Sequence, residues 1–200
     1  MAASKDLTIE QGKTFTQVLR WEIQPVVYKA ITAITQSAPV RITCPEHGVP
    51  QGWRVAVVSV KGMAQINSSN TPPKAKDYHQ ATVINADTLE LNDINAAEFK
   101  AYVSGGYVQY NTPVDLTGMS ARLVIKDKVG GTELLRLDSS ALGGIVLNNS
   151  TKTITATISA TVSAALTWKK GVYELEIEDS LGHVSSLLAG AVTVTKEIAS

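Results

Sequence analysis

The chain has a single cysteine, Cys44, and only three histidines in 200 residues. One thiol cannot form an internal disulfide bond, so a disulfide-stapled fold is excluded. A structural zinc site needs about four closely spaced Cys or His ligands, and His47, His79 and His183 are too scattered to supply them. We therefore expect a fold that is held together by packing alone.

Net charge and long apolar runs are also lacking. Lys and Arg together number 18, as do Asp and Glu, and neither sign gathers into a block. A general nucleic-acid binder or a polybasic membrane binder would need a basic surface, which this balance does not provide. The opening stretch MAASKDLTIEQG lacks the apolar core of a signal peptide, and no segment approaches the ~20 apolar residues of a membrane span. We expect a soluble protein that is made in a cytoplasm.

What the sequence does have is strand periodicity. The run SARLVIKDK alternates Ala121, Leu123 and Ile125 with neighbours that point the other way, which is typical of a half-buried antiparallel strand. Three more runs follow this period, each with one face formed by Ile154, Ala156 and Ile158, by Tyr173, Leu175 and Ile177, or by Gln17, Leu19, Trp21 and Ile23. These runs predict four strands of one sheet system.

Turn residues separate the strands of the C-terminal half. Gly130 and Gly131 lie between two strand-like runs, as a hairpin connection requires. Asp179 and Gly182 surround a second tight reversal, after which LAGAVTVTKEIA supplies a last strand. We therefore expect antiparallel hairpins in this half.

One short helix is predicted in SATVSAALTWKKG, between two of these strands. Ser159 is a suitable N-cap, and Gly171 would end the helix. Val162, Ala165 and Leu166 would face inward. Because it joins two strands, the segment is predicted to be a crossover helix.

The middle of the chain has a different texture. Prolines and glycines divide AITAITQSAPVRITCPEHGVPQGWRVAVVSV into short strands, and YHQATVI and TLEL follow as two more strands around an NAD turn. Asn95 and Glu98 have the spacing of a capping box, which predicts one helical turn before Gly105 and Gly106. Roughly five or six short strands with tight turns indicate a compact β-barrel.

Together these segments predict a discontinuous domain. A barrel over residues 26–111 leaves one sandwich strand before it and the other strands after it. Such an insertion is tolerated where the ends of the host loop lie close together. The predicted fold class is all-β: a β-sandwich of residues 1–25 and 112–200, which serves as the assembly domain, carries an inserted β-barrel of residues 26–111.

The two flanking segments also carry a resemblance. DLTIEQGKTFTQVLRW, PVDLTGMSARLVIKDKVGGTELLRL and the remaining C-terminal strands resemble a family of small virion proteins of tailed bacteriophages. That family has an immunoglobulin-like β-sandwich related to the N-terminal domain of baseplate upper proteins. In it a strand ending in an aromatic residue leads into the DLTG turn, here Asp115 to Gly118. The resemblance implies an immunoglobulin-like fold and a structural role in a viral tail.

The middle segment resembles a small β-barrel repeat of phage tail proteins, which is similar to the first catalytic-cysteine half-domain of ubiquitin-activating enzymes. The matching residues are His47, Gly48, Gly52, Val55, Gly62, Met63 and Asn67. The stretches TLEL and SGG, which follow them in the chain, match as well. These are turn and core positions. The resemblance therefore implies a fold more than an activity.

Cys44 and His47 stand close together in ITCPEHG, where a nucleophile and its base could pair. No glycine-flanked elbow, second base or oxyanion loop accompanies them, so a small core residue at a strand end is the favoured interpretation of Cys44. The three histidines could gather a metal ion, but each lies in or beside a turn. We expect a protein that is not an enzyme and holds no metal and no cofactor.

Two further groups have a bland and a functional interpretation. Glu174, Glu176 and Glu178 share one strand face. In a functional interpretation they bind a cation or a basic partner. In the second interpretation they form an exposed strand face or a charged edge that prevents aggregation. The second interpretation is favoured. The three tryptophans could stack on sugars, but their strand or helix-end positions favour a core or interface role for Trp21, Trp53 and Trp168.

The best candidate for a contact surface is the loop NSSNTPPKAKDYH. It is polar, stiffened by prolines and long for such a compact domain. The predicted partner-contact residues are Ser68, Ser69, Asn70, Thr71, Pro72, Pro73 and Lys74.

These observations predict a structural subunit of a tailed-phage particle, made in the host cytoplasm and located in the virion tail. It would be a tail, baseplate or tail fibre adaptor that docks in several copies as a homo-oligomeric ring, because sandwiches present flat faces and sheet edges. Its partners would be tail tube, baseplate or fibre subunits, with the barrel meeting a neighbour or the host surface, and without nucleic acid or membrane insertion. The alternatives are a capsid decoration or head–tail connector protein and a host-glycan-binding module.

Overall fold

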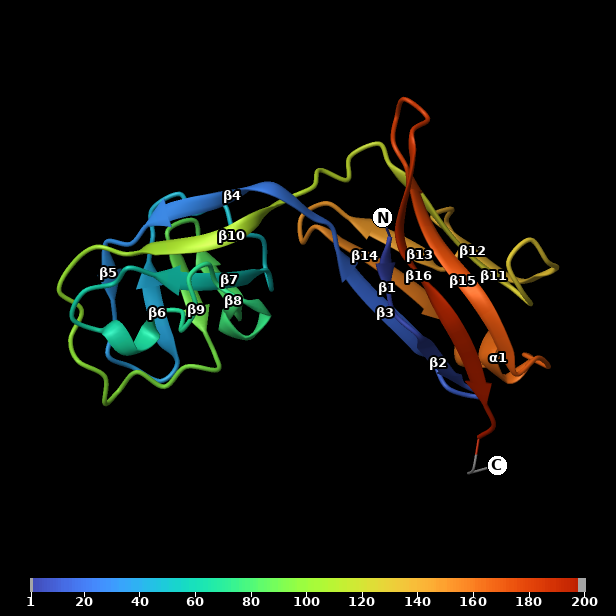
Figure 1. Cartoon of the computed structure of the whole chain (residues 1–200), viewed down its shortest axis with the longest axis horizontal. Helices are drawn as coiled ribbons and strands as arrows, with labels where there is room; N and C mark the ends of the chain where they lie inside the picture. The colour runs from blue at the N-terminus through green and yellow to red at the C-terminus, as the bar shows by residue number, and fades with distance from the viewer. Residues whose placement is uncertain (1, 198–200) are drawn as a thin grey trace. The chain divides into compact units, whose positions relative to one another are not determined.

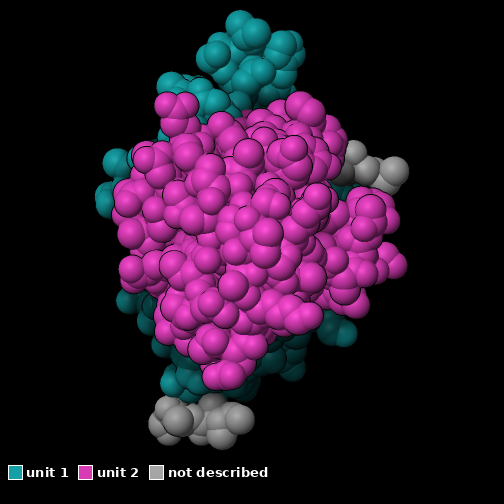
Figure 2. All heavy atoms as spheres, turned by 90° about the vertical axis from the view of Figure 1, so that its left-hand side faces the viewer, with its two compact units in different colours: residues 1–21, 115–200 teal, residues 22–114 magenta. Residues whose placement is uncertain are grey.

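The computed structural model of the chain describes residues 2–197. Strands make up 49% and helices 6% of the chain, so the predicted all-β class is confirmed. The chain forms two compact units, which Figure 2 colours separately: unit 1 comprises residues 1–21 and 115–200, and unit 2 comprises residues 22–114. Over the described residues, no helix has the length and apolar character needed to cross a membrane.

Unit 1 is a β-sandwich of two sheets (Figure 1). The six-stranded sheet consists of β1 (Ala3–Ser4), β2 (Leu7–Glu10), β11 (Ser120–Lys126), β12 (Glu133–Asp138), β15 (Lys170–Glu178) and β16 (Val184–Thr195). The three-stranded sheet consists of β3 (Phe15–Arg20), β13 (Ile145–Asn148) and β14 (Thr153–Ile158). The orders are β1-β16-β15-β11-β12, with β2 also paired to β16, and β13-β14-β3.

The core of unit 1 follows the predicted period of two. The predicted inward residues on three strands are all buried, and they are Ala121, Leu123, Ile125, Ile154, Ala156, Ile158, Tyr173, Leu175 and Ile177. Both hairpins predicted from turn residues are present, since β12 pairs antiparallel with β11 and β16 with β15. The N-terminal segment belongs to the same core, because Leu7 and Ile9 of β2 are buried. The Tyr173 hydroxyl also donates to the Lys5 carbonyl at 2.7 Å.

The run TFTQVLRWEI is not one strand, which corrects the predicted face. The alternation holds for Gln17 and Leu19 in β3, which pairs with β14 in unit 1. The strand ends at Arg20, and the next strand begins at Glu22 and belongs to the other unit, where Ile23 is exposed. Trp21 therefore marks the change of sheet, and a continuous period-two pattern concealed it.

The crossover helix α1 (Ala160–Ala164) joins β14 of the small sheet to β15 of the large one, as predicted. Ser159 caps it by accepting a hydrogen bond from the Val162 backbone nitrogen. The inward face was predicted wrongly in part: Leu166 is buried, but Val162 and Ala165 are exposed. Ser163 is buried instead, and its hydroxyl donates to the Lys13 carbonyl.

Gly171 does not end the helix, which corrects a second expectation. It lies inside β15, where an added Cβ would stand 2.7 Å from the Lys126 carbonyl oxygen. The glycine is needed for the close approach of the neighbouring strand β11 rather than for a helix cap.

Unit 2 is one curled seven-stranded sheet with the order β4-β10-β7-β8-β9-β6-β5. Its strands are β4 (Glu22–Ala30), β5 (Ala33–Ile34), β6 (Val40–Thr43), β7 (Arg54–Val58), β8 (His79–Asn85), β9 (Thr88–Leu91) and β10 (Tyr107–Pro113). The two ends of this order, β4 and β5, are joined in the chain by Ile31 and Thr32 alone. The sheet therefore bends back toward itself around one core.

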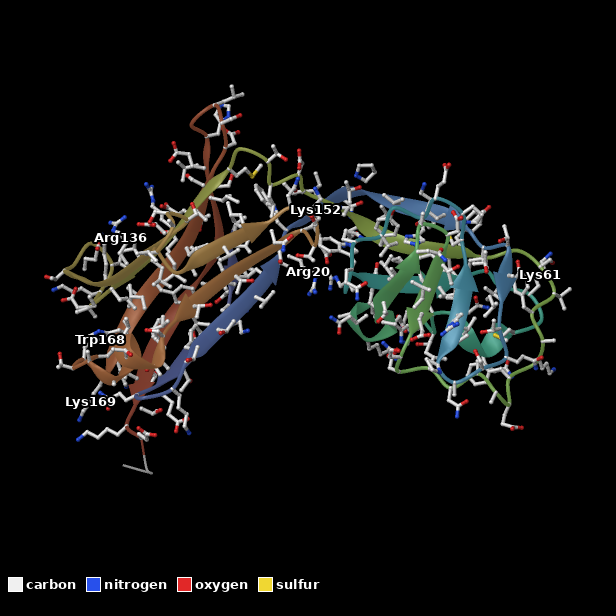
Figure 3. All side chains as sticks on the ribbon, turned by 180° about the vertical axis from the view of Figure 1, so that it is seen from behind. Arg20, Lys61, Arg136, Lys152, Trp168 and Lys169 are labelled. Carbon is white, nitrogen blue, oxygen red and sulfur yellow. The ribbon has the colours of Figure 1, made fainter. Side chains whose placement is uncertain are left out.

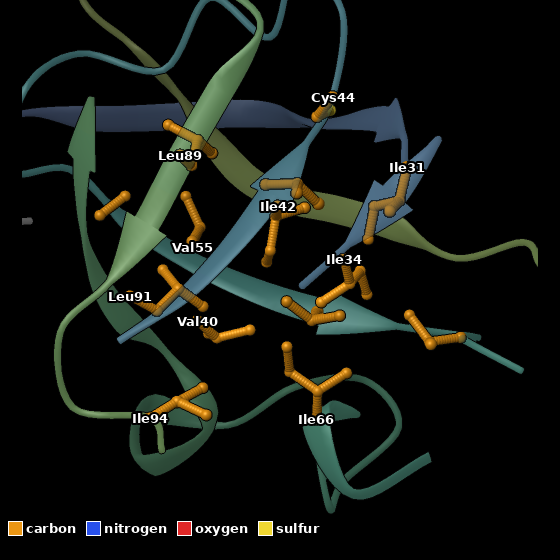
Figure 4. Close-up of a cluster of buried hydrophobic side chains, with 14 of the residues drawn as sticks. Ile31, Ile34, Val40, Ile42, Cys44, Val55, Ile66, Leu89, Leu91 and Ile94 are labelled. Carbon is orange, nitrogen blue, oxygen red and sulfur yellow. The ribbon is translucent and has the colours of Figure 1, made fainter. Parts of the chain in front are cut away.

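The core of unit 2 is a single cluster of aliphatic side chains from nearly every strand (Figure 4). Trp53, Met63, Leu89 and Leu91 are among its fully buried members. The indole nitrogen of Trp53 donates to the Asn111 carbonyl at 3.1 Å. Trp53 is thus a core residue whose polar atom is satisfied, as the core interpretation predicts.

The two strands that connect the units form a ladder at the base of unit 2. β4 and β10 pair antiparallel from Ala30 opposite Tyr107 down to Glu22 opposite Pro113. The Glu22 carboxylate accepts from the Arg54 guanidinium and, at 2.9 Å, from the Asn111 amide. This ladder extends unit 2 a few residues beyond the predicted range of 26–111 on each side, to 22–114.

The helical turn predicted from Asn95 and Glu98 is wrong. The Asn95 side chain accepts from the Ala97 backbone nitrogen at 3.0 Å, which makes a polar turn without a helix. The short helices of unit 2 are instead two 3₁₀ turns, η1 (Ala64–Ile66) and η2 (Ala75–Asp77), on either side of the predicted contact loop.

Candidate functional site

The predicted contact loop Ser68–Lys74 lies in unit 2 between η1 and η2, in the connection from β7 to β8. Thr71, Pro72 and Lys74 are exposed, as a contact surface requires. Ser68 turns inward at one end, where its hydroxyl donates to the Asn70 carbonyl at 2.8 Å. The loop is therefore folded on itself and presents its central residues outward.

One buried carboxylate, Asp77, organises this loop. Its Oδ1 accepts from the Ser69 hydroxyl at 2.7 Å and the Ser69 backbone nitrogen at 3.2 Å. Its Oδ2 accepts from the Asn70 amide and the Lys74 backbone nitrogen, both at 2.8 Å. These hydrogen bonds, the one from the Lys74 backbone first, hold the pKa of Asp77 far below its usual range. A loop fixed in this way loses little conformational entropy on binding.

Beside the loop lies a polar hollow of about 340 Å³. Ser68 and Ser69 line it from one side, and Asp93 and Asn95 line it from the turn after β9. His79, at the start of β8, completes the lining, with its Nδ1 2.7 Å from Asp93 Oδ2. The structure thus brings two of the seven predicted loop residues into a hollow, and the other five do not line it.

The hollow offers hydroxyl, amide, imidazole and carboxylate groups, with Lys76 and Phe99 also on its wall. The His79–Asp93 pair has the form of the base and its orienting carboxylate in a catalytic triad. Neither serine completes such a triad, because the Ser68 hydroxyl donates to Asn70 and the Ser69 hydroxyl to Asp77. The arrangement suits hydrogen bonding to a polar ligand better than nucleophilic attack.

Cys44 and His47 do not form a nucleophile and base pair. Cys44 is fully buried, and burial raises the pKa of its thiol to about 11, which opposes formation of a thiolate. Both ring nitrogens of His47 contact backbone: Nδ1 accepts from the Val49 nitrogen at 2.9 Å, and Nε2 lies 2.9 Å from the Asn85 carbonyl. His47 therefore ties its turn to β8, and Cys44 fills the core.

The three histidines lie in separate surroundings. His47 is buried, His79 lines the hollow, and His183 sits at the tip of the β15–β16 hairpin beside Asp179. Within residues 2–197, no group of three or more His, Cys, Asp or Glu side chains is arranged to hold a metal ion.

The glutamate row lies on the solvent face of the large sheet of unit 1. Glu174 and Glu178 are exposed, and Glu176 pairs with Arg122 on the neighbouring strand. β15 lies between β11 and β16, so the row is not on a sheet edge. The charged-edge interpretation is therefore wrong, while the exposed-face interpretation agrees with the register.

Unit 1 has hollows that the sequence does not predict, and two of them exceed the polar hollow of unit 2 in volume. One, of about 610 Å³, lies over β11, β15 and β16 beside the Arg122–Glu176 ion pair. The other, of about 790 Å³, is lined by the Ser139–Gly144 loop, β13 and the start of α1. The only signal for the second was Leu142, an apolar residue in an otherwise small and polar turn.

The tryptophans divide as their positions suggest: Trp53 is a core residue of unit 2, whereas Trp21 and Trp168 are half-buried in unit 1. Figure 3 labels Trp168, which follows α1. Neither a protein-family model nor a curated protein matches this chain. The candidate sites are therefore the ordered loop with its polar hollow on unit 2 and the two hollows described above on unit 1.

Proposed function

We propose that the chain is a structural subunit of a tailed-phage particle, an adaptor in the tail, baseplate or fibre attachment. One observation supports this most: the sandwich of unit 1 is built from both ends of the chain and carries unit 2 as an insertion between β3 and β11. This agrees with the two family resemblances of the sequence, which divide the chain at nearly the same places. An adaptor needs two separately folded modules, one to dock and one to present.

Unit 1 is the docking module. It has a broad sheet face, two hollows and the free edges of β12 and β13, at which the two sheets end. Repetition of one contact of such a sandwich around an axis closes a homo-oligomeric ring. Unit 2 is the presenting module, since its loop at Thr71 and Pro72 is exposed and held in one shape by Asp77.

The test is a cryo-electron reconstruction of the purified parent particle with the chain traced in it. We expect several copies in the tail, with unit 1 against neighbouring virion subunits. Density for the chain on the capsid would favour the capsid decoration alternative, and density at the neck would favour the head–tail connector alternative. Absence of the chain from the particle would overturn the proposal.

A second function, binding of a host glycan by unit 2, is favoured by the polar hollow beside the predicted loop. Paired carboxylate, amide and hydroxyl groups next to a phenyl ring at Phe99 are the groups that hold sugars. A glycan array probed with the full chain tests it. Binding that is lost in Asp93→Asn and kept in Asp127→Asn, which changes a distant carboxylate, would support the module, and a silent array would remove it.

A further inference from the structure

The β15–β16 hairpin ends in an apolar residue that the fold itself does not use. Leu181 is 80% exposed at the tip, and Val184 beside it is also exposed. Figure 1 shows this hairpin standing out from the rest of the sandwich. A large aliphatic side chain in water at a protruding position contributes nothing to the core of its own chain.

The tip is nevertheless held rigidly. Asp179 Oδ1 accepts from the backbone nitrogens of Leu181 at 2.8 Å and His183 at 2.9 Å, and the Gly182 nitrogen donates back to the Asp179 carbonyl at 3.0 Å. Hydrogen bonds from the His183 backbone and side chain lower the pKa of Asp179, so the carboxylate stays charged. Leu181 is thus presented in a fixed position, which lowers the entropy cost of inserting it into a partner.

Elsewhere on the same unit, the hollow of about 790 Å³ is bordered by exposed aliphatic side chains. Leu142 is 100% exposed, Val146 is 62% exposed and Val162 is 40% exposed. Half-buried leucines of β12 and β13 form part of the floor. Three such side chains around one hollow mark a protein contact rather than a chance exposure.

We propose that the Leu181 tip of one copy inserts into this hollow of a second copy. This inference rests on the proposed multi-copy role and names the contact that would build it. An apolar knob on one part of a molecule and an apolar hollow on another part form a heterologous contact, which repeats from copy to copy.

A second copy fits as the occupant because one chain carries both the exposed Leu181 tip and the hollow with its exposed aliphatic border, and no net charge opposes the contact. Arg136, which Figure 3 labels on β12, is the only charged side chain among the described residues that line the hollow, and its guanidinium is already ion-paired with Glu133 at 2.6 Å. The hollow therefore carries little net charge. At the tip, Glu178 and Asp179 precede Leu181 in the chain, and the Asp179 carboxylate lies 3.0 Å from His183 Nδ1. The chain also has 18 basic and 18 acidic residues, so copies do not repel each other through net charge at neutral pH.

The test uses the full chain in two variants that each remove one side of the contact. Leu181→Asp leaves the hollow intact, and Leu142→Asp leaves the tip intact; both positions are exposed, so both variants should fold. In sedimentation equilibrium up to millimolar concentration, we expect the wild type to self-associate and each variant to do so at least about tenfold more weakly. The matched control, Val103→Asp, changes a 72% exposed residue of unit 2 and should self-associate like the wild type.

Mixing the two variants supplies the sharper signature. One intact tip and one intact hollow remain, so the mixture should form one-to-one complexes that neither variant forms alone. A monomeric wild type, association that Leu181→Asp leaves unchanged, or a mixture without complexes would each overturn the contact. The reconstruction of the particle tests the proposed function separately. A ring in the tail that is held together by other residues would support the proposed function and contradict this contact.

Discussion

The two units differ in how they use polar groups. Among the described residues, the buried polar or charged side chains are His47, Asp77 and Gln109 in unit 2, but only Ser163 in unit 1. Unit 1 is built from alternating strands whose polar groups face water. Unit 2 has long connections between short strands, and its buried polar groups hold these connections in place: Asp77 bonds within one connection, while His47 and Gln109 link connections to strands. Regular strands pair their backbone polar groups in the sheet ladder, whereas irregular connections need side-chain hydrogen-bond partners for theirs.

The comparison predicts first that the two units fold independently. Replacing residues 23–112 by Asn-Gly joins Glu22 to Pro113, which lie opposite each other in the ladder. The remaining sandwich should keep its whole core and unfold in one cooperative thermal transition, followed by circular dichroism. The matched fragment, residues 22–114, should do the same. An unfolded sandwich after excision would show that unit 1 depends on unit 2.

Single core truncations should then destabilise one unit at a time. Leu89→Ala in unit 2 and Leu175→Ala in unit 1 each remove a fully buried side chain. Each should lower the free energy of unfolding of its own unit by about 2–5 kcal/mol. Native-state hydrogen exchange resolves the units by their amides. Faster exchange throughout both units in either variant would contradict the division.

A smaller effect is expected from removing one hydroxyl from each unit. The Tyr110 hydroxyl donates to the His47 carbonyl in unit 2, and the Tyr173 hydroxyl donates to the Lys5 carbonyl in unit 1. Either Tyr→Phe change removes one buried donor and should cost about 1 kcal/mol. Urea denaturation of the two variants measures this. Tyr110→Phe should also loosen the turn at His47, seen as faster exchange of the Val49 amide, with Tyr173→Phe as the control.

The last prediction concerns the dependence of stability on pH. Because the folded pKa of Asp77 is lowered, its contribution to stability is present above the unfolded pKa of about 4 and is lost as pH falls toward the folded value. Asp77→Asn should therefore reduce the urea midpoint of unit 2 at pH 6 and make it less dependent on pH below about 4. The other carboxylates whose pKa is lowered belong to unit 1. The urea midpoint of unit 1 should therefore depend on pH in the same way in the wild type and in Asp77→Asn. If the urea midpoint of unit 2 changed with pH in the same way in the wild type and in Asp77→Asn, Asp77 would not be the source of the pH dependence.

The sandwich strands could be predicted because their period of two is set by the strand geometry itself. The same rule failed at Trp21, since alternation continues through a change of sheet and carries no information on which partner each strand pairs with. The predictions of an inward Val162 and of a helix end at Gly171 were wrong because tertiary contacts decide both positions. The Ser163 hydroxyl fixes the helix face, and Gly171 gives room to the Lys126 carbonyl.

The candidate sites were less predictable than the strands. The loop Ser68–Lys74 could be identified from its composition, but its order depends on Asp77, which follows it in the chain and is buried by the fold. The pairing of His79 with Asp93 and the hollow around Leu142 bring together residues from separate connections. Spacing along the sequence cannot show such contacts, because they depend on strand order in the finished sheets.

The ladder of β4 and β10 also affects how unit 2 withstands proteolysis and mechanical force. Both covalent connections leave unit 2 at one place, where Glu22 lies opposite Pro113. A protease that cuts one connection there would leave the inserted unit attached through the other. A pulling force on unit 2 would likewise be shared by the two neighbouring backbone connections rather than carried by one.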